Sequence, residues 1–383
     1  MESFDFELRT RLVFGAGSVD RVGTLSREMG FTRPLLVADH GLRDAGHVDR
    51  VSRILHDDGL DAISFHDFDV NPDTTMVDSG AEFARRRTVD SIVALGGGSS
   101  LDCAKGINFL ASNGGTMADY RGYGKATKPM LPMIAVPTTA GTGSEAQSYA
   151  VIADAATKLK MACGDPQAAF RIAVIDPELT LSQPTAVTAA AGFDAIAHAV
   201  ETAVTTRRNA VSALYSREAF RLLNGHVEDV LRDPDNIGAR AAMHLGAFYA
   251  GIAIESSMLG AAHACANPLT ARYQMTHGVA LAIVLPSVVR WNSQTGDELY
   301  RDLVSDSLNP DAEDPDTNIG DQLAARLVSI GNACGFPSRL RDTGVDEGDL
   351  AALAGVAAEQ WTGSFNPRPF SAPQALEVYE CAY

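Results

Sequence analysis

The chain has 383 residues, of which 46% are hydrophobic and 21% are charged, values typical of a folded globular protein rather than a disordered one. At roughly 150 residues per domain, this length predicts two domains. The 31 basic and 48 acidic side chains give a net charge of −17. Because such a surface repels phosphate backbones and anionic lipids, we expect neither nucleic acid nor membrane as a partner.

The expected location is the cytoplasm. We find no apolar run that approaches the roughly 20 residues needed to span a bilayer. The first ten residues lack the basic-then-apolar layout of a signal peptide. The five cysteines are scattered and form no CxxC pair, a usage typical of reduced thiols.

Short apolar runs alternate with helical patterns through the first half of the chain. The apolar runs are 35–39, a segment within 61–71, 91–95, 133–136 and 172–176, and the helical patterns include 48–56 and 74–87. Apolar strands that alternate with helices are typical of a parallel sheet covered on both faces. Residues 1–182 are therefore expected to form an α/β domain, with ligands at the carboxyl ends of its strands.

After residue 183, Ala, Leu and charged residues recur at helical spacing. Clear examples are 212–223, 239–254 and 323–333. Pro184 and Pro286 are expected to mark helix boundaries, and 309–317 reads as a polar loop. We therefore expect residues 183–383 to form an all-helical domain.

Three consecutive glycines, Gly96, Gly97 and Gly98, stand between the apolar run 91–95 and a helical pattern. Without Cβ atoms, this turn allows a diphosphate to approach the backbone, and the first N–H groups of the following helix face that anion. We expect Ser99 to cap the helix and to bind a phosphate oxygen. The turn therefore predicts a phosphate-binding site.

Three further segments bear on nucleotide binding. Residues 137–145, rich in Thr and Gly, suit a ribose or phosphate wall but also an ordinary polar loop. Asp39 ends the run 35–39, where a carboxylate either binds ribose hydroxyls and repels a 2′-phosphate or caps a helix. Residues 15–20 offer two glycines but Asp20 at the third glycine position, after a weak strand pattern, so we interpret them as a turn.

One carboxylate and three imidazoles lie in strongly apolar segments. Asp194 and His198 are four residues apart, on one face of an Ala-rich helix, a spacing that chance alone produces about once in this chain. An unpaired charge in such surroundings is costly, and a cation relieves that cost. His263 and His277 have equally apolar neighbours. The four residues suit iron(II) or zinc with a coordination position open to substrate. The other histidines are expected at the surface or partly buried with partners: His40, His47, His56, His66, His226 and His244.

Motifs from nearly end to end of the chain together resemble those of the iron-containing (group III, metal-dependent) alcohol dehydrogenases. They occupy 14–18, Asp39, 71–72, 96–105, 137–145, 175–177, 192–201, 259–269, 277–280 and 366–368. The resemblance implies an NAD(P)-binding α/β domain, a helical metal-binding domain and at least a homodimer. It also implies reversible oxidation of a small primary alcohol or diol, by hydride transfer to the nicotinamide of NAD, to an aldehyde or ketone.

The resemblance also assigns residues by position. It implies that Asp194, His198, His263 and His277 are the metal ligands. It places the cofactor against Asp39, Asn71, Gly97, Gly98, Ser99, Asp102, Thr138, Thr139 and Thr142, with Val151, Lys160 and Leu179 near the nicotinamide half. An Asp at position 39 goes with NAD rather than NADP, in agreement with the repulsion of a 2′-phosphate.

The chain departs from the family pattern at Asn267. Family members commonly carry a further histidine four residues after the third metal ligand. An amide can form hydrogen bonds but cannot transfer a proton at neutral pH, so a ribose hydroxyl or water would have to relay the proton. Three alternatives stay open: a polyol or glycerol-type dehydrogenase, a metal- and NAD-dependent lyase resembling dehydroquinate synthase, and a non-catalytic binding protein with the same fold.

Overall fold

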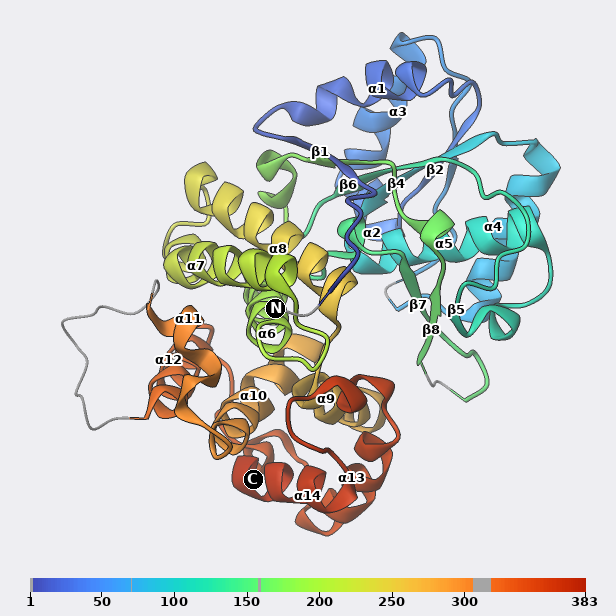
Figure 1. The fold of residues 1–383 in the computed structure, drawn as a ribbon. Helices are drawn as coiled ribbons and strands as arrows, with labels where there is room; N and C mark the ends of the chain where they lie inside the picture. The colour runs from blue at the N-terminus through green and yellow to red at the C-terminus, as the bar shows by residue number, and fades with distance from the viewer. Residues whose placement is uncertain (1–2, 70, 158–159, 306–317) are drawn as a thin grey trace. The chain divides into compact units, whose positions relative to one another are not determined.

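The computed structural model describes residues 3–69, 71–157, 160–305 and 318–383. The polar loop expected at 309–317 lies outside these residues. The chain divides into two compact units (Figure 1). One is formed by residues 7–183, and the other by residues from 184 to the carboxyl terminus together with residues 3–6.

The first unit contains a six-stranded parallel sheet with the order β1-β9-β6-β4-β2-β3. Its strands are β1 (Arg11–Phe14), β2 (Pro34–Val37), β3 (Ile63–Phe65), β4 (Ser91–Gly96), β6 (Met133–Pro137) and β9 (Ile172–Ile175). The five apolar runs expected as strands are all present. The weak pattern before Gly15 is also a strand, β1, which lies at the sheet edge and, among the described strands, pairs with β9 alone.

Both faces of the sheet are covered by helices, which explains its unbroken apolar strands (Figure 1). Alternate residues such as Val93 and Leu95 belong to a core shared with α1 (Val22–Glu28) and α3 (His47–Asp57). Their neighbours in β4 point to the opposite face. There α4 (Thr74–Arg87) and α5 (Gly98–Asn113) pack against each other, and a short α2 (His40–Asp44) follows β2.

A second, smaller sheet was not expected from the sequence. It has the order β5-β8-β7, formed by β5 (Gly122–Tyr123), β8 (Lys160–Gly164) and β7 (Tyr149–Ala153). The β7 and β8 strands are antiparallel neighbours, with Val151 opposite Ala162. Because α5 contacts β7, this sheet is part of the same unit as the glycine-rich turn.

The second unit is helical, as expected. Its helices are α6 (Thr185–Thr202), α7 (Ala210–Arg232), α8 (Ile237–Ser257), α9 (Ala261–Tyr273), α10 (His277–Ser293), α11 (Arg301–Ser305), α12 (Ile319–Ala333), α13 (Leu350–Ala358) and α14 (Ala372–Ala382). Almost every residue of α6 from Thr188 onward is buried, because α7, α8 and α10 all pack against this helix. Polar side chains on α6 therefore lie in the centre of the unit.

The expectation that Pro286 marks a helix boundary is wrong. Pro286 lies inside α10, and Pro268 lies inside α9. A proline removes one hydrogen bond of a helix, but packing on buried neighbours outweighs that cost here, since nearly all of α10 is buried. Pro184, by contrast, directly precedes α6 as expected.

Helix α8 contradicts two further expectations. It is long and apolar enough to cross a membrane, yet 67% of its most apolar window is buried inside the protein, so we interpret it as a core helix. Its His244 is fully buried rather than exposed or paired, and neither ring nitrogen has a hydrogen-bond partner among the described residues. Burial lowers the pKa of His244 to about 3, so the imidazole is neutral.

Candidate metal centre and cofactor-binding turn

Three helices bring the four predicted metal ligands together in the helical unit. Asp194 and His198 lie one turn apart on α6, with His198 Nε2 3.1 Å from Asp194 Oδ1. His263, in the first turn of α9, places Nε2 3.4 Å from the same oxygen, and His277, the first residue of α10, places Nε2 3.9 Å from it. One ligand atom each from Asp194, His263 and His277 lies within 4.8 Å of the others.

A close helix contact sets the position of His277. A Cβ on Gly278 would lie 2.0 Å from the backbone oxygen of Ala190, so only glycine allows α10 to begin this close to α6. Since Asp194 is one helical turn beyond Ala190, the contact places His277 beside Asp194. The Nδ1 atom of His277 lies 3.3 Å from the Thr270 hydroxyl, which orients the ring.

The cluster fits a divalent cation. Asp194 Oδ1 and His263 Nε2 are buried, and neither has a hydrogen-bond partner among the described residues, although they face each other. Atoms of this kind are costly to bury unless a cation or proton joins them. One carboxylate and imidazole nitrogens form a donor set that suits iron(II) or zinc.

The electrostatics of the cluster favour positive charge. Burial alone would raise the pKa of Asp194, but the neighbouring His198, His263 and His277 hold it well below its usual value. Burial would likewise lower the pKa of His263, but Glu201 and Asp194 raise it to about 9. The side chains of Asp194, His198 and His263 are almost completely buried, whereas that of His277 is 26% exposed. The cluster is therefore reached from the side of His277.

In the first unit, the three glycines form the expected turn between β4 and α5. Helix α5 begins at Gly98 with Gly97 as its N-cap residue, and no side chain among the described residues caps it. The expectation that Ser99 caps the helix is therefore wrong. A Cβ on Gly98 would lie 2.6 Å from the Thr142 side chain, and one on Gly97 3.1 Å from Thr139. The threonine loop thus packs directly against the turn.

Two residues in the segments that follow β2 and β3 also contact the turn. The Ser99 hydroxyl accepts a hydrogen bond from the Asn71 backbone N–H, at 3.1 Å. Asp39 Oδ2 accepts one from the Ser100 hydroxyl, at 3.0 Å, and its Oδ1 caps α2 through the Leu42 N–H. The helix-cap interpretation of Asp39 is therefore correct. Its half-buried carboxylate stands at the carboxyl end of β2, where ligands bind in such sheets.

Asp102, one turn into α5, joins the threonine loop to the small sheet. Its carboxylate accepts hydrogen bonds from the Ser144 hydroxyl (2.6 Å) and from the Val151 N–H (3.1 Å). Beneath it lies Lys105, whose side chain is completely buried. The Lys105 ammonium donates to the Ser144 hydroxyl and backbone oxygen and to the Tyr149 backbone oxygen.

The remaining predicted residues differ in exposure. Thr138 is buried at the end of β6, and Leu179 is buried in the core that α1 and α3 share with the sheet. Val151 and Lys160 are exposed on β7 and β8. In the helical unit, Asn267 is half-buried one turn after His263, and its amide donates to Gln360 Oε1, at 3.2 Å.

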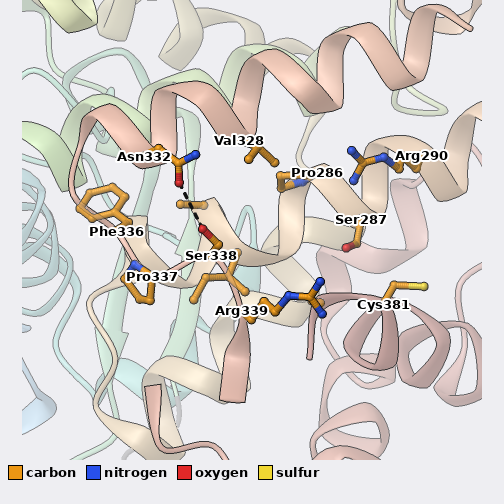
Figure 2. A pocket seen from close by; sticks show the side chains of 14 residues that line it. Pro286, Ser287, Arg290, Val328, Asn332, Phe336, Pro337, Ser338, Arg339 and Cys381 are labelled. Carbon is orange, nitrogen blue, oxygen red and sulfur yellow. Dashed lines mark hydrogen bonds between the residues drawn. The ribbon is translucent and has the colours of Figure 1, made fainter. Parts of the chain in front are cut away.

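A separate cavity of about 210 Å³ lies in the helical unit (Figure 2). Apolar side chains such as Pro286, Val328 and Phe336 line it together with Arg290 and Arg339. A hydrogen bond from Ser338 to Asn332 closes part of its wall. None of the predicted site residues lines this cavity.

Comparison with known proteins identifies the family. The model of the iron-containing alcohol dehydrogenases matches residues 9–177, and the model of the carboxyl-terminal part of this family matches residues 188–383. The chain belongs to the iron-containing alcohol dehydrogenase family. The family, the fold and the alcohol dehydrogenase activity expected from the resemblance are confirmed.

Relatives and solved structures agree with this family over the whole chain. The NAD-dependent methanol dehydrogenase of Bacillus methanolicus is 33% identical, over 97% of each chain. The 1,3-propanediol dehydrogenase of Citrobacter freundii is 33% identical, over 99% of each chain. The crystal structure of a 1,3-propanediol oxidoreductase superimposes with a TM-score of 0.95 at 32% identity, over 100% of both chains.

Sequence reasoning missed two buried charges of this alcohol dehydrogenase. Glu201 is two turns beyond Asp194 on α6, and its carboxylate accepts hydrogen bonds from His263 Nδ1 and from the Ala262 N–H. Lys105 lies under the glycine-rich turn. The signal for Glu201 was present, because a spacing of seven places it on the same helix face as Asp194. Nothing local in the sequence indicates that Lys105 is buried.

Proposed function

We propose that the protein transfers hydride reversibly between a small primary alcohol or diol and NAD, with an aldehyde or ketone as the oxidised product. The observation that carries this proposal is the convergence of Asp194, His263 and His277, with His198 Nε2 3.1 Å from Asp194 Oδ1, in a member of the iron-containing alcohol dehydrogenase family. NAD and a small alcohol or diol are supported by the methanol and 1,3-propanediol dehydrogenases, which match nearly the whole chain.

The four clustered side chains would hold one divalent ion, iron(II) or zinc. When bound, such an ion supplies Lewis-acid chemistry, which lowers the pKa of an alcohol hydroxyl and polarises a carbonyl. Asp194 supplies the negative charge, and the imidazoles supply neutral nitrogen donors. Because only the His277 side is exposed, substrate would enter there, and the buried remainder of the cluster would exclude water.

In this proposal, residues 1–182 bind NAD and residues 183–383 bind the metal. The diphosphate would lie against Gly97, Gly98 and Ser99 at the N-terminus of α5, where backbone N–H groups and the helix dipole favour an anion. Asp39 would accept hydrogen bonds from the adenosine ribose. The other residues assigned to the cofactor are Asn71, Asp102, Thr138, Thr139, Thr142, Val151, Lys160 and Leu179.

Asn267 would contribute hydrogen bonding rather than proton transfer. Its amide donates a hydrogen bond to Gln360, and both side chains are amides that offer further donors and acceptors. The proton released on oxidation would pass to water or a ribose hydroxyl. The surroundings of the proposed enzyme would be the cytoplasm, and its assembly a homodimer or a higher homo-oligomer.

The experiment that tests this function is metal removal and replacement. Purified protein is freed of metal by chelation and assayed with short alcohols, diols and aldehydes, with NADH followed by its absorbance. We expect chelation to abolish NADH formation, and iron(II) or zinc to restore it. Full turnover without metal would contradict the metal site, and metal and NAD binding without any NADH would contradict the dehydrogenase.

A further inference from the structure

Glu201 holds the ring of His263 in one orientation. Its side chain is only 4% exposed, and Oε2 lies 2.5 Å from His263 Nδ1. Because a carboxylate only accepts, Nδ1 carries a proton, and when a cation displaces the second proton of the ring, the lone pair of His263 is on Nε2. That nitrogen faces Asp194 Oδ1, 3.4 Å away. The hydrogen bond thus fixes the tautomer in which His263 can bind a cation.

The same carboxylate also holds the start of α9. This helix has Gly260 as its N-cap, which offers no side chain to the first N–H groups. Instead, Glu201 Oε1 accepts from the Ala262 N–H at 2.6 Å, and Asn366 Oδ1 accepts from the Ala261 N–H at 3.3 Å. Two distant segments therefore replace the missing cap and fix the backbone next to His263.

Gly260 leaves little room for a side chain in this arrangement. A Cβ at this position would lie 3.0 Å from Glu201 Oε1 and 3.1 Å from Asn366 Oδ1, closer than ordinary contacts allow. Because both atoms are hydrogen-bonded to the first turn of α9, neither can move away freely. A methyl group there would disturb the two acceptors without removing any polar atom.

Asn366 is itself fixed by a pair of buried amides. Its Nδ2 donates to Asn292 Oδ1 at 2.8 Å, and Asn292 Nδ2 donates back to Asn366 Oδ1 at 3.2 Å. Asn292 lies in the last turns of α10, the helix that begins at His277. The network thus links α6, α9, α10 and the motif at 366–368.

Charge gives a second reason for a carboxylate at this position. A divalent ion held by Asp194 and neutral imidazoles would leave one uncompensated positive charge in a buried cluster. Such a charge is costly where water is excluded. Glu201, hydrogen-bonded to His263, brings a second negative charge and makes the assembly neutral.

We propose that Glu201, assisted by Asn366, is a positioning residue that tunes the metal affinity of the cluster through His263. The inference rests on the proposed function only in that a divalent ion occupies the cluster. Carboxylates that orient metal-binding histidines in this way typically change metal affinity by 10- to 100-fold when removed.

The test measures metal affinity rather than turnover. We compare wild-type protein with E201Q, which keeps the shape of the side chain but removes its charge. The dissociation constants of Zn²⁺ and Co²⁺ are measured by competition with a chelator, and the Co²⁺ absorption spectrum reports the coordination. We expect E201Q to bind either ion roughly 10- to 100-fold more weakly, with an altered Co²⁺ spectrum.

E228Q is the matched control. Glu228 pairs with Arg326 in the same unit, so the variant loses the same charge away from the cluster and should keep wild-type metal affinity. If E201Q does not fold, as judged by circular dichroism, G260A takes its place and should weaken binding in the same direction. Wild-type affinity in folded E201Q, or in G260A where E201Q fails to fold, would overturn the inference. A wild-type protein that binds no metal would instead contradict the proposed function itself.

Discussion

At the scale of single residues, Asp39 combines a structural role with a proposed functional one. Its Oδ1 caps α2 and its Oδ2 accepts a hydrogen bond from Ser100. A carboxylate has acceptor capacity beyond these two bonds, which leaves room for a ribose hydroxyl. The same negative charge would repel a 2′-phosphate, so Asp39 is the residue at which cofactor choice can be tested.

We predict that Asp39→Asn improves the use of NADPH relative to NADH. The amide keeps an oxygen that can cap α2. Glycine would remove the cap as well as the charge, so a change in protein stability could not be separated from a change in cofactor specificity. The NADPH/NADH ratio of kcat/KM should rise roughly tenfold, equivalent to about 1.4 kcal/mol. Asp44→Asn, at the far end of α2, is the control and should leave the ratio unchanged. An unchanged ratio in Asp39→Asn would remove Asp39 from its assigned role.

At the scale of helices, the metal cluster depends on how closely α10 approaches α6. At Gly278 the nearest opposing atoms are backbone atoms of Ala190. No side chain can therefore move aside to make room for a larger residue at position 278. Any group larger than hydrogen at position 278 must therefore push the helices apart and carry His277 with them.

We predict that Gly278→Ala lowers the free energy of unfolding by about 1–3 kcal/mol, because overpacking forces a backbone shift. The same shift moves His277 and should weaken metal binding. The comparison is Gly225→Ala on α7, where an added Cβ meets nothing within 4 Å. That variant should be neutral or more stable by up to about 1 kcal/mol, since alanine is the better helix former. Urea denaturation measures both. Equal stability of the two variants would show that the α6–α10 contact is looser than described.

The helices and strands that were predicted correctly share one property. Their apolar periodicity is strong enough to be recognised without knowing which elements pack against them. The helix expected at 74–87 has those bounds, and the buried strands follow from their apolar runs. Strand β1 was underestimated because an edge strand has only one neighbour and a weaker apolar pattern. Pro286 was misinterpreted because a local rule for helix ends ignores the packing that holds α10 together.

The four side chains of the candidate metal site could be predicted from the sequence. The hydrogen bonds that hold these side chains and the adjacent backbone in place could not. The four side chains stood out as polar groups in apolar segments. The position of Glu201 on the α6 face of Asp194 was readable from spacing. Its bonds to His263 and Ala262, and the bond of Asn366 to Ala261, join segments far apart in the chain and exist only in the fold. Sequence spacing indicates which residues share a helix face, but not which helix they will face.

At the scale of the whole molecule, each unit buries a titratable group that makes stability depend on pH. In the helical unit, burial lowers the pKa of His244 from 6.5 to about 3. In the other unit, burial raises the pKa of Glu145 from 4.5 to about 7, although Lys105 opposes the shift. Both groups are therefore held neutral in the folded protein, which costs free energy of folding. For His244 this cost grows as the pH falls, and for Glu145 it grows as the pH rises.

The signs follow from proton binding. Between pH 6.5 and 3 the unfolded chain holds a proton on His244 that the folded chain lacks, so this group lowers stability as the pH falls. Between pH 4.5 and 7 the folded chain holds a proton on Glu145 that the unfolded chain has lost, so this group lowers stability as the pH rises. Each contributes a slope of about 1.4 kcal/mol per pH unit, and between pH 4.5 and 6.5 the two slopes oppose each other.

We predict that replacing either side chain removes its contribution to the pH dependence of the free energy of unfolding. Relative to wild type, Glu145→Gln should gain stability as the pH rises from 4.5 to 7, by up to about 3 kcal/mol. The reason is that the folded wild-type protein must keep this carboxyl protonated while the unfolded chain ionises, and glutamine carries no such cost. His244→Leu should gain relative stability as the pH falls below 6.5. Urea unfolding of metal-free protein at a series of pH values, followed for each unit, measures the differences. If either variant runs parallel to wild type across its window, the side chain is hydrated in solution and carries no such cost.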